Sequence, residues 1–328
     1  MAKKIFSIFL RVGISIVLLV FLFRQVDEKV LFGIIRNANK PLLVAAFLIF
    51  GLIYLLCIWR WKMLLEAAQI KLPLKRIVIS FAGGIFFNMF LPSTIGGDFV
   101  RSVDLAAHTK KPRQIVATVF LDRLSGYIGL VIVALLALLF GWKLLQDRST
   151  LFSVILITAL LIAILFFFFN SFVFSKVNKF FESPGSGKIK EAIGNLHEEI
   201  HHFKNHKRLI IDNLVLSFFI QIVSPVTFYT IALSLGIKIN ITYFFIFLPI
   251  IGAITLLPIS IGGLGLRDAA TIFFFAKAGV GKDLAFAMSL MSFLFLLLYA
   301  ALGGLIYVLT VHHRRLQSDQ PSAVCPRS

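Results

Sequence analysis

Six long apolar runs dominate this chain and restrict what it can fold into. They cover residues 5–23, 42–58, 115–140, 151–169, 209–235 and 284–309. About 20 helical residues at 1.5 Å each cross the roughly 30 Å hydrocarbon core of a bilayer. Inside lipid, a helix satisfies its own backbone hydrogen bonds. The runs therefore predict an all-α integral membrane protein with about six full transmembrane helices.

Composition excludes the soluble alternatives. Of the 328 residues, 59% are apolar and 15% are charged, whereas soluble domains average about 45–50% apolar. A soluble enzyme, a nucleic-acid-binding module and a disordered chain are all excluded. The net charge of +18 resides in short loops between the runs, so the partners it predicts are anionic lipid headgroups and not nucleic acid.

Two shorter apolar stretches, 77–91 and 241–257, each lead into a proline followed by a Gly-Gly pair. They are short for a full crossing and suit one arm of a re-entrant hairpin. We therefore predict two such hairpins, at 77–106 and 241–280.

The tips of the two hairpins repeat one pattern. Residues 92–101 and 258–267 both read P-x-x-I-G-G-x-x-x-R, about half the chain apart. Paired Gly/Pro interruptions in corresponding halves are typical of transporter sites built from broken helices. The alternative is a pair of ordinary helix–loop–helix units with glycine-rich turns.

Loop charges predict that the repeat is inverted. If the first hairpin enters from the cytoplasm and the second from outside, cytoplasmic segments hold 20 basic residues and outside loops hold 8. This bias follows the positive-inside rule and places both termini in the cytoplasm. The predicted divisions are a first membrane half (1–170), a cytoplasmic amphipathic connector (171–208), a second membrane half (209–310) and a cytoplasmic tail (311–328).

Glycines at the tips allow close backbone approach, and a helix that starts there presents free amides to an anion. An arginine one turn further on can hold a phosphate through two parallel hydrogen bonds. We expect the arginines of both halves to form one phosphate clamp. The residues predicted for it are Gly96, Gly97, Arg101, Gly262, Gly263 and Arg267.

Polar residues near the tips complete the predicted substrate site. Asp98 and Asp268 adjoin the arginines and either hold them in place or meet a cationic headgroup; alternatively, each pair merely closes its own hairpin. Asn88 precedes the first tip, and its side chain could hydrogen-bond to backbone groups that the break in the helix leaves without partners. Asp122 and Arg123 interrupt the run 115–140 and lie either at the interface or in the cavity.

One motif points to different chemistry. His197–His201 fits H-E-x-x-H, which on a helix can place two imidazoles and a glutamate at a zinc ion, so a membrane metalloprotease is a competing hypothesis. The motif lies in a polar stretch and no third ligand follows at a known spacing. We therefore predict no metal, no cofactor and no catalytic residue.

Residues 87–101 and 257–268 resemble the signature stretches of the lysylphosphatidylglycerol synthase transmembrane-region family, the flippase-like proteins. The resemblance implies a multi-pass protein of a prokaryotic cytoplasmic (inner) membrane that moves an aminoacylated or other phospholipid, or a polyprenol-phosphate lipid, between leaflets. Larger members carry an aminoacyl-transfer domain after the membrane part, and the tail 311–328 has no room for one. A separate lipid-synthesising enzyme and a second copy of the chain are thus possible partners. The alternatives are a membrane-embedded enzyme acting on a lipid headgroup and a non-transporting partner of a lipid synthase.

Overall fold

The computed structural model describes residues 20, 28–89, 96–109, 111–141, 148–169, 194, 196, 198–200, 207–255 and 263–318. All regular secondary structure in these ranges is helical, which confirms the all-α prediction for the described part of the chain. The helices are α2 (Glu28–Arg36), α3 (Lys40–Ala67), α4 (Leu74–Asn88), α5 (Gly96–Thr109), α6 (Pro112–Gly141), α7 (Arg148–Phe169), α10 (Lys207–Ser234), α11 (Thr242–Thr255), α12 (Leu266–Ala276) and α13 (Lys282–Ser318).

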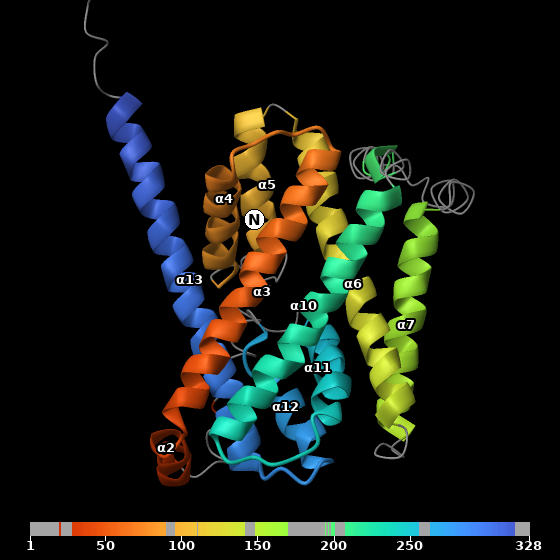
Figure 1. Ribbon diagram of the computed structural model, residues 1–328, viewed down its shortest axis with the longest axis vertical. Coiled ribbons are helices and arrows are strands. Elements are labelled where there is room, and N and C mark those ends of the chain that lie inside the picture. Colours follow the sequence, from red (N-terminus) through yellow and green to blue (C-terminus); the bar gives the residue numbers. More distant parts are fainter. Residues whose placement is uncertain are drawn as a thin grey trace, which may run out of the picture.

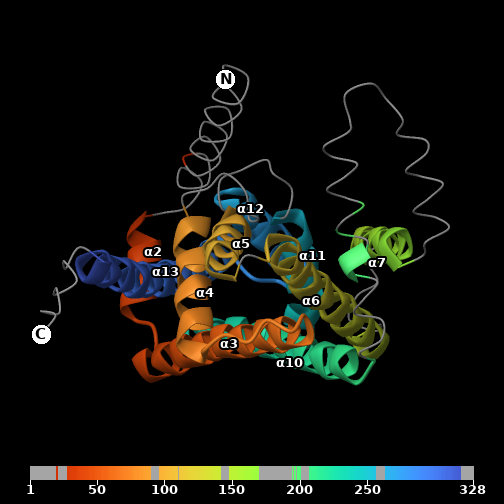
Figure 2. The same cartoon turned by 90° about the horizontal axis from the view of Figure 1, so that it is seen from above.

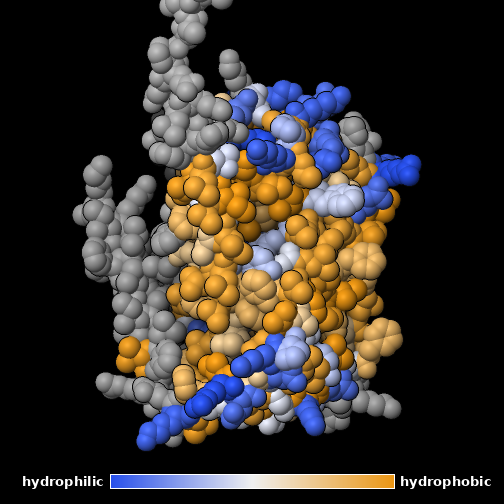
Figure 3. All heavy atoms as spheres, turned by 60° about the vertical axis from the view of Figure 1, so that its left-hand side comes forward, coloured by the Kyte–Doolittle hydropathy of each residue, from blue (hydrophilic) through white to orange (hydrophobic). Residues whose placement is uncertain are grey.

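Four of these helices, α3, α6, α10 and α13, are long and apolar enough to cross a membrane. They coincide with four of the six predicted spans, and α7 covers a fifth run as a helix of 22 residues. The space-filling view shows a broad hydrophobic band between two hydrophilic ends (Figure 3). These features describe a multi-pass membrane protein. The first apolar run, 5–23, and nearly all of the predicted connector 171–208 lie outside the described residues.

Two pairs of short helices lie at opposite ends of the bundle. Figure 1 shows α4 and α5 in its upper half, and α11 and α12 in its lower half, while α3, α10 and α13 run past both pairs. The pairs correspond to the predicted hairpins, but both tips, 90–95 and 256–262, lie outside the described residues.

The packing of the two halves is reciprocal. In the first half, α4 packs against α13 and α5 against α6; in the second, α11 packs against α6 and α12 against α13. The helices α3 and α10 lie side by side, as Figures 1 and 2 both show. Each pair of short helices is thus held by long helices from both halves of the chain.

Glycine brings α4 and α5 into backbone contact. A Cβ atom at Gly97 would collide with the carbonyl oxygen of Gly84, and one at Gly303 on α13 would lie 2.7 Å from the carbonyl oxygen of Ala82. These approaches leave no room for any side chain. The glycines therefore fix the start of α5, and the polar residues that follow it, against α4.

The interiors of the two halves differ in chemistry. Around α11 and α12 the interior is mainly aromatic and aliphatic, with Phe244, Phe247 and Phe275 fully buried, and it includes one buried carboxylate, Asp268. Around α4, α5 and α6, by contrast, Arg60, Arg101 and Asp122 are buried. Burying a charge is costly unless it is paired, so this part of the molecule is the place to look for a site.

Candidate functional site

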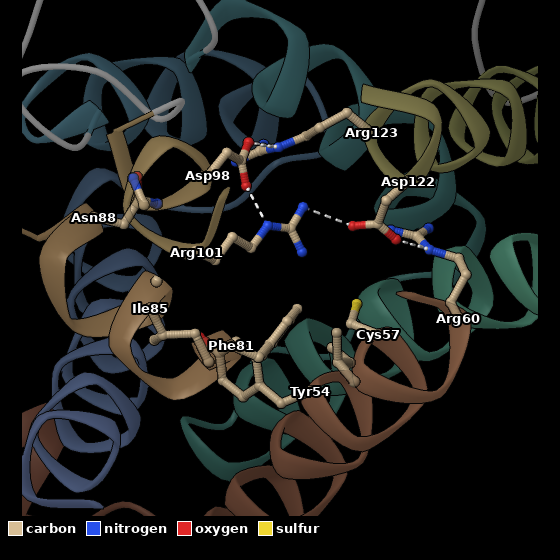
Figure 4. A pocket seen from close by; sticks show the side chains of 13 residues that line it. Tyr54, Cys57, Arg60, Phe81, Ile85, Asn88, Asp98, Arg101, Asp122 and Arg123 are labelled. Atoms are coloured by element: carbon tan, nitrogen blue, oxygen red, sulfur yellow. Dashed lines mark hydrogen bonds and ion pairs between the residues drawn. The ribbon is translucent and has the colours of Figure 1, made fainter. Parts of the chain in front are cut away.

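A cavity of about 260 Å³ lies between α3, α4, α5 and α6. We call it the arginine cavity; Figure 4 shows its side chains converging from these four helices. It is lined by Ile53, Tyr54, Cys57, Arg60, Phe81, Gly84, Ile85, Asn88, Gly97, Asp98, Arg101, Asp122 and Arg123. Asp122 is ten residues into α6, about 15 Å along the helix axis.

Five charged residues form one alternating chain of ion pairs along the cavity wall (Figure 4). Arg60 Nε lies 2.8 Å from Asp122 Oδ1, and Arg101 Nη2 lies 2.9 Å from Asp122 Oδ2. Arg101 Nε in turn lies 3.0 Å from Asp98 Oδ1. Arg123 Nε closes the chain on the other oxygen of Asp98. Each carboxylate is therefore held by two guanidinium groups.

Among the described residues of this chain of ion pairs, three arginines face two aspartates, which leaves one positive charge more than the carboxylates neutralise. Arg101 and Asp122 are each only 3% exposed, whereas the side chain of Arg123, at one end, is 33% exposed. In surroundings of low dielectric constant, an uncompensated charge interacts far more strongly than it does in water. The arginine cavity is thus suited to a ligand that carries a single negative charge.

Aromatic rings support the central arginine. The guanidinium carbon of Arg101 lies 4.7 Å from the ring centroid of Trp61 and 5.5 Å from that of Phe81. Trp61 is fully buried, and its Nε1 donates to Thr118 Oγ1 on α6 at 3.3 Å. One terminal nitrogen of Arg101 points to Asp122, and the other points toward the open part of the cavity (Figure 4).

Helix α10 holds Arg60 in place. Arg60 Nη1 donates to Ser217 Oγ at 3.2 Å, and Asn213 Nδ2 donates to the carbonyl oxygen of Arg60 at 3.2 Å. Both partners are buried. The second half of the chain therefore positions a charge in the site of the first half.

The structure brings six of the predicted site residues together at this cavity: Asn88, Gly97, Asp98, Arg101, Asp122 and Arg123. Gly96 begins α5 beside them. Asn88 accepts a hydrogen bond from the backbone N–H of Gly97 at 3.4 Å, which ties the end of α4 to the start of α5. Asp122 and Arg123 both line this cavity.

Arg267 and Asp268 lie elsewhere, between α12 and α13, and the described lining of the arginine cavity does not include them. Arg267 Nη2 lies 3.1 Å from Asp268 Oδ1, and its guanidinium carbon lies 5.3 Å from the ring centroid of Phe293. Asp268 is fully buried and accepts from the backbone N–H of Gly265 and the hydroxyl of Ser289. Gly263 has a left-handed φ of 75°; Gly262 lies outside the described residues.

Sequence reasoning missed Arg60, Trp61, Tyr54 and Cys57. Arg60 was counted among the basic residues of a loop, because the apolar run ends at residue 58, but α3 continues to Ala67. Helical spacing could have indicated the other three residues: Tyr54, Cys57 and Trp61 lie three and four residues apart and so share one face of α3. Asp104, three residues after Arg101 on α5, does not join this chain of ion pairs; its Oδ1 lies 2.6 Å from Arg76 Nη2.

Metal binding finds no support in the described part of the chain, where no three histidine, cysteine, aspartate or glutamate side chains gather as possible ligands. His197 and His201 lie outside the described residues, so the structure does not test their motif.

Helices of membrane-spanning length around a buried, charged cavity define a multi-pass membrane protein with a polar site between its helices. The sequence matches the lysylphosphatidylglycerol synthase TM-region family over residues 8–304, and the chain belongs to that family. It is similar to two proteins of Methanothermobacter thermautotrophicus, each named UPF0104 membrane protein. One is 24% identical over 275 residues, which is 77% of this chain and 80% of the relative. The other is 24% identical over 302 residues, which is 83% of this chain and 84% of the relative.

Proposed function

We propose that this protein moves a phosphate-bearing lipid between the two leaflets of a prokaryotic cytoplasmic membrane, with the lipid phosphate bound in the arginine cavity. The observation that carries the proposal is the charge of that cavity, where three arginines face two aspartates. A phosphodiester carries one negative charge and would neutralise it. Membership of a family named for lysylphosphatidylglycerol synthases supports a lipid as the ligand.

Arg101 is the residue we expect to contact the phosphate. Its guanidinium is held by Asp98 and Asp122 and backed by Trp61, while its remaining terminal nitrogen faces the cavity (Figure 4). A guanidinium fixed in this way loses little rotational freedom on binding. Arg60 and Arg123 add positive charge on either side.

The proposal is of a transporter and not of an enzyme. Asp98 and Asp122 are each ion-paired with two arginines, and paired carboxylates of this kind are poor general bases. Arg267 was predicted to hold the same phosphate from the second half. Since it contacts Asp268 and Phe293 instead, we propose that it acts at another stage of transport.

We further propose that the two halves form an inverted repeat, with re-entrant hairpins and both termini cytoplasmic. The reciprocal packing of α4 on α13 and of α11 on α6 supports this arrangement. The test uses a chain whose cysteines are replaced by Cys57→Ala and Cys325→Ser. A cysteine at His108 should then be labelled only from inside, and one at Lys238 only from outside; labelling of both from one side would overturn the inverted topology.

The native Cys57 provides a direct test of the cavity charge. The chain has two cysteines, so Cys325→Ser leaves Cys57 as the one thiol, with its sulfur facing the cavity (Figure 4). We expect an anionic methanethiosulfonate reagent to modify it about five-fold faster than a cationic one of similar size, since a unit charge contributes about 1 kcal/mol at close range even in water. Arg101→Gln should abolish the preference, and Lys62→Gln, an exposed change on the same helix, should retain it.

Transport itself is measured in proteoliposomes that contain phosphatidylglycerol with a fluorescent acyl chain. An impermeant reductant reports which leaflet holds the label. We expect protein-dependent movement that is lost in Arg101→Gln and Arg60→Gln and kept in Lys62→Gln. Equal movement in all four proteins would overturn the proposed role of the cavity.

A further inference from the structure

A second hollow lies in the other half of the molecule, between α6, α10 and α11. It has a volume of about 310 Å³ and a lining that is apolar except for one threonine. We call it the α6–α10–α11 groove. It is lined by Val133, Leu136, Ala137, Phe140, Phe218, Ile222, Ile241, Thr242 and Phe245.

The groove opens onto the surface that faces the bilayer. Its neighbours Leu139 on α6 and Phe219 on α10 are exposed, and both helices are long and apolar enough to span a membrane. The groove is therefore in contact with hydrocarbon chains. At about 30 Å³ for a water-sized group, it has room for roughly ten methylene groups of one chain.

A cation, Lys238, lies close in sequence to one end of the groove. α6 ends at Gly141, where an added Cβ would approach the side chain of Thr242 at the start of α11. Lys238 precedes the groove residue Ile241 by three positions, hence by no more than about 11 Å of chain. It is exposed and makes no ion pair with any residue that the structure describes. The apolar groove matches the hydrocarbon chain of a lipid, and the nearby cation matches its anionic phosphate.

We propose that the α6–α10–α11 groove holds one hydrocarbon chain of a phosphate-bearing lipid whose phosphate pairs with Lys238. This site is distinct from the arginine cavity. Asp122 and Val133 are eleven residues apart on α6, about 16 Å along its axis, and the two sites open between different helices. The inference does not depend on the proposed transport activity.

The test is photo-crosslinking with phosphatidylglycerol that carries a diazirine in one acyl chain. The full-length protein is reconstituted, irradiated and digested, and the labelled peptides are identified by mass spectrometry. We expect the labelling to concentrate on residues 133–140, 218–222 and 241–245. A diacylglycerol with the same diazirine chain should label them about five-fold less, because it lacks the phosphate.

Two variants and a control make the result decisive. Lys238→Gln, in an exposed loop, should reduce labelling of the groove about five-fold and leave labelling of α3 unchanged. Ile222→Trp should fill the groove and exclude the chain, whereas Leu139→Trp, on the exposed face of α6, should not. Equal labelling of all lipid-facing helices, insensitive to Lys238, would overturn the proposal. Arg101→Gln should leave the labelling intact, which separates this inference from the proposed function.

Discussion

Asp122 and Arg60 lie 62 positions apart in the sequence, yet Oδ1 of one is 2.8 Å from Nε of the other. This pair joins α3 to α6, and the second oxygen of Asp122 reaches Arg101 on α5. A single buried carboxylate therefore ties three helices together. Its loss leaves two guanidinium groups short of a partner in the same cavity.

Replacing Asp122 by asparagine should destabilise the protein strongly. Removing one partner of a buried ion pair costs about 3–5 kcal/mol, because the remaining charge is left uncompensated. We expect a loss of that size in the free energy of unfolding, measured by chemical denaturation in detergent micelles. Asp212→Asn, an exposed change on α10, is the control and should be neutral. A small effect of Asp122→Asn would mean that water already solvates this ion pair.

Replacing Gly97 by alanine should separate α4 from α5. The added Cβ would meet the carbonyl oxygen of Gly84, and overpacking of this kind costs about 1–3 kcal/mol. Because Asp98 and Arg101 follow on the same helix, Cys57 should also lose its preference for the anionic reagent. Gly33→Ala on α2, where nothing lies within 4 Å, should be neutral or slightly stabilising.

Two tryptophans two positions apart on α3 should respond differently to replacement by phenylalanine. Trp61 is fully buried, contacts Arg101 and donates to Thr118, so Trp61→Phe should cost about 1 kcal/mol of stability. Trp59 is 65% exposed and faces the bilayer, so Trp59→Phe should leave the unfolding midpoint unchanged. Equal effects would contradict the role assigned to Trp61.

Arg267→Gln and Arg101→Gln should separate the two arginines that the repeated motif makes equivalent. Both variants should lose lipid movement in proteoliposomes if each residue serves one stage of transport. Only Arg101→Gln should change the reaction of Cys57 with charged reagents, because Arg267 is not part of the described cavity lining. If Arg267→Gln also changed that reaction, the two arginines would share one site, as the sequence pattern first indicated.

Most of the described fold was predictable, because it rests on patterns local in the sequence. Apolar runs identified α3, α6, α10 and α13, since the bilayer requires about 20 apolar residues in succession. Gly-Gly pairs after proline identified the breaks between α4 and α5 and between α11 and α12. The interruption of an apolar run by Asp122 and Arg123 marked them as residues of either the interface or the cavity, because charge within an apolar run is costly, and both line the arginine cavity.

The rest of the site was not predictable, because its partners come from distant parts of the chain. No local pattern joins Arg60 to Asp122, or Asn213 and Ser217 on α10 to Arg60. The symmetry of the repeated motif is also misleading. The motif makes Arg101 and Arg267 equivalent, but their surroundings differ. Arg101 donates to Asp122, whereas Arg267 lies beside the ring of Phe293.

If the protein transports lipid as proposed, the extra positive charge of three arginines facing two aspartates would make transport sensitive to voltage. A unit charge that crosses the whole membrane gains or loses about 2.3 kcal/mol for every 100 mV of potential. The empty cavity carries such a charge, and a bound phosphodiester cancels it. The membrane potential should therefore act on any movement of the empty cavity and leave the loaded one almost untouched, so that the return step, and not the step that carries the lipid, would respond to the energised state of the cell.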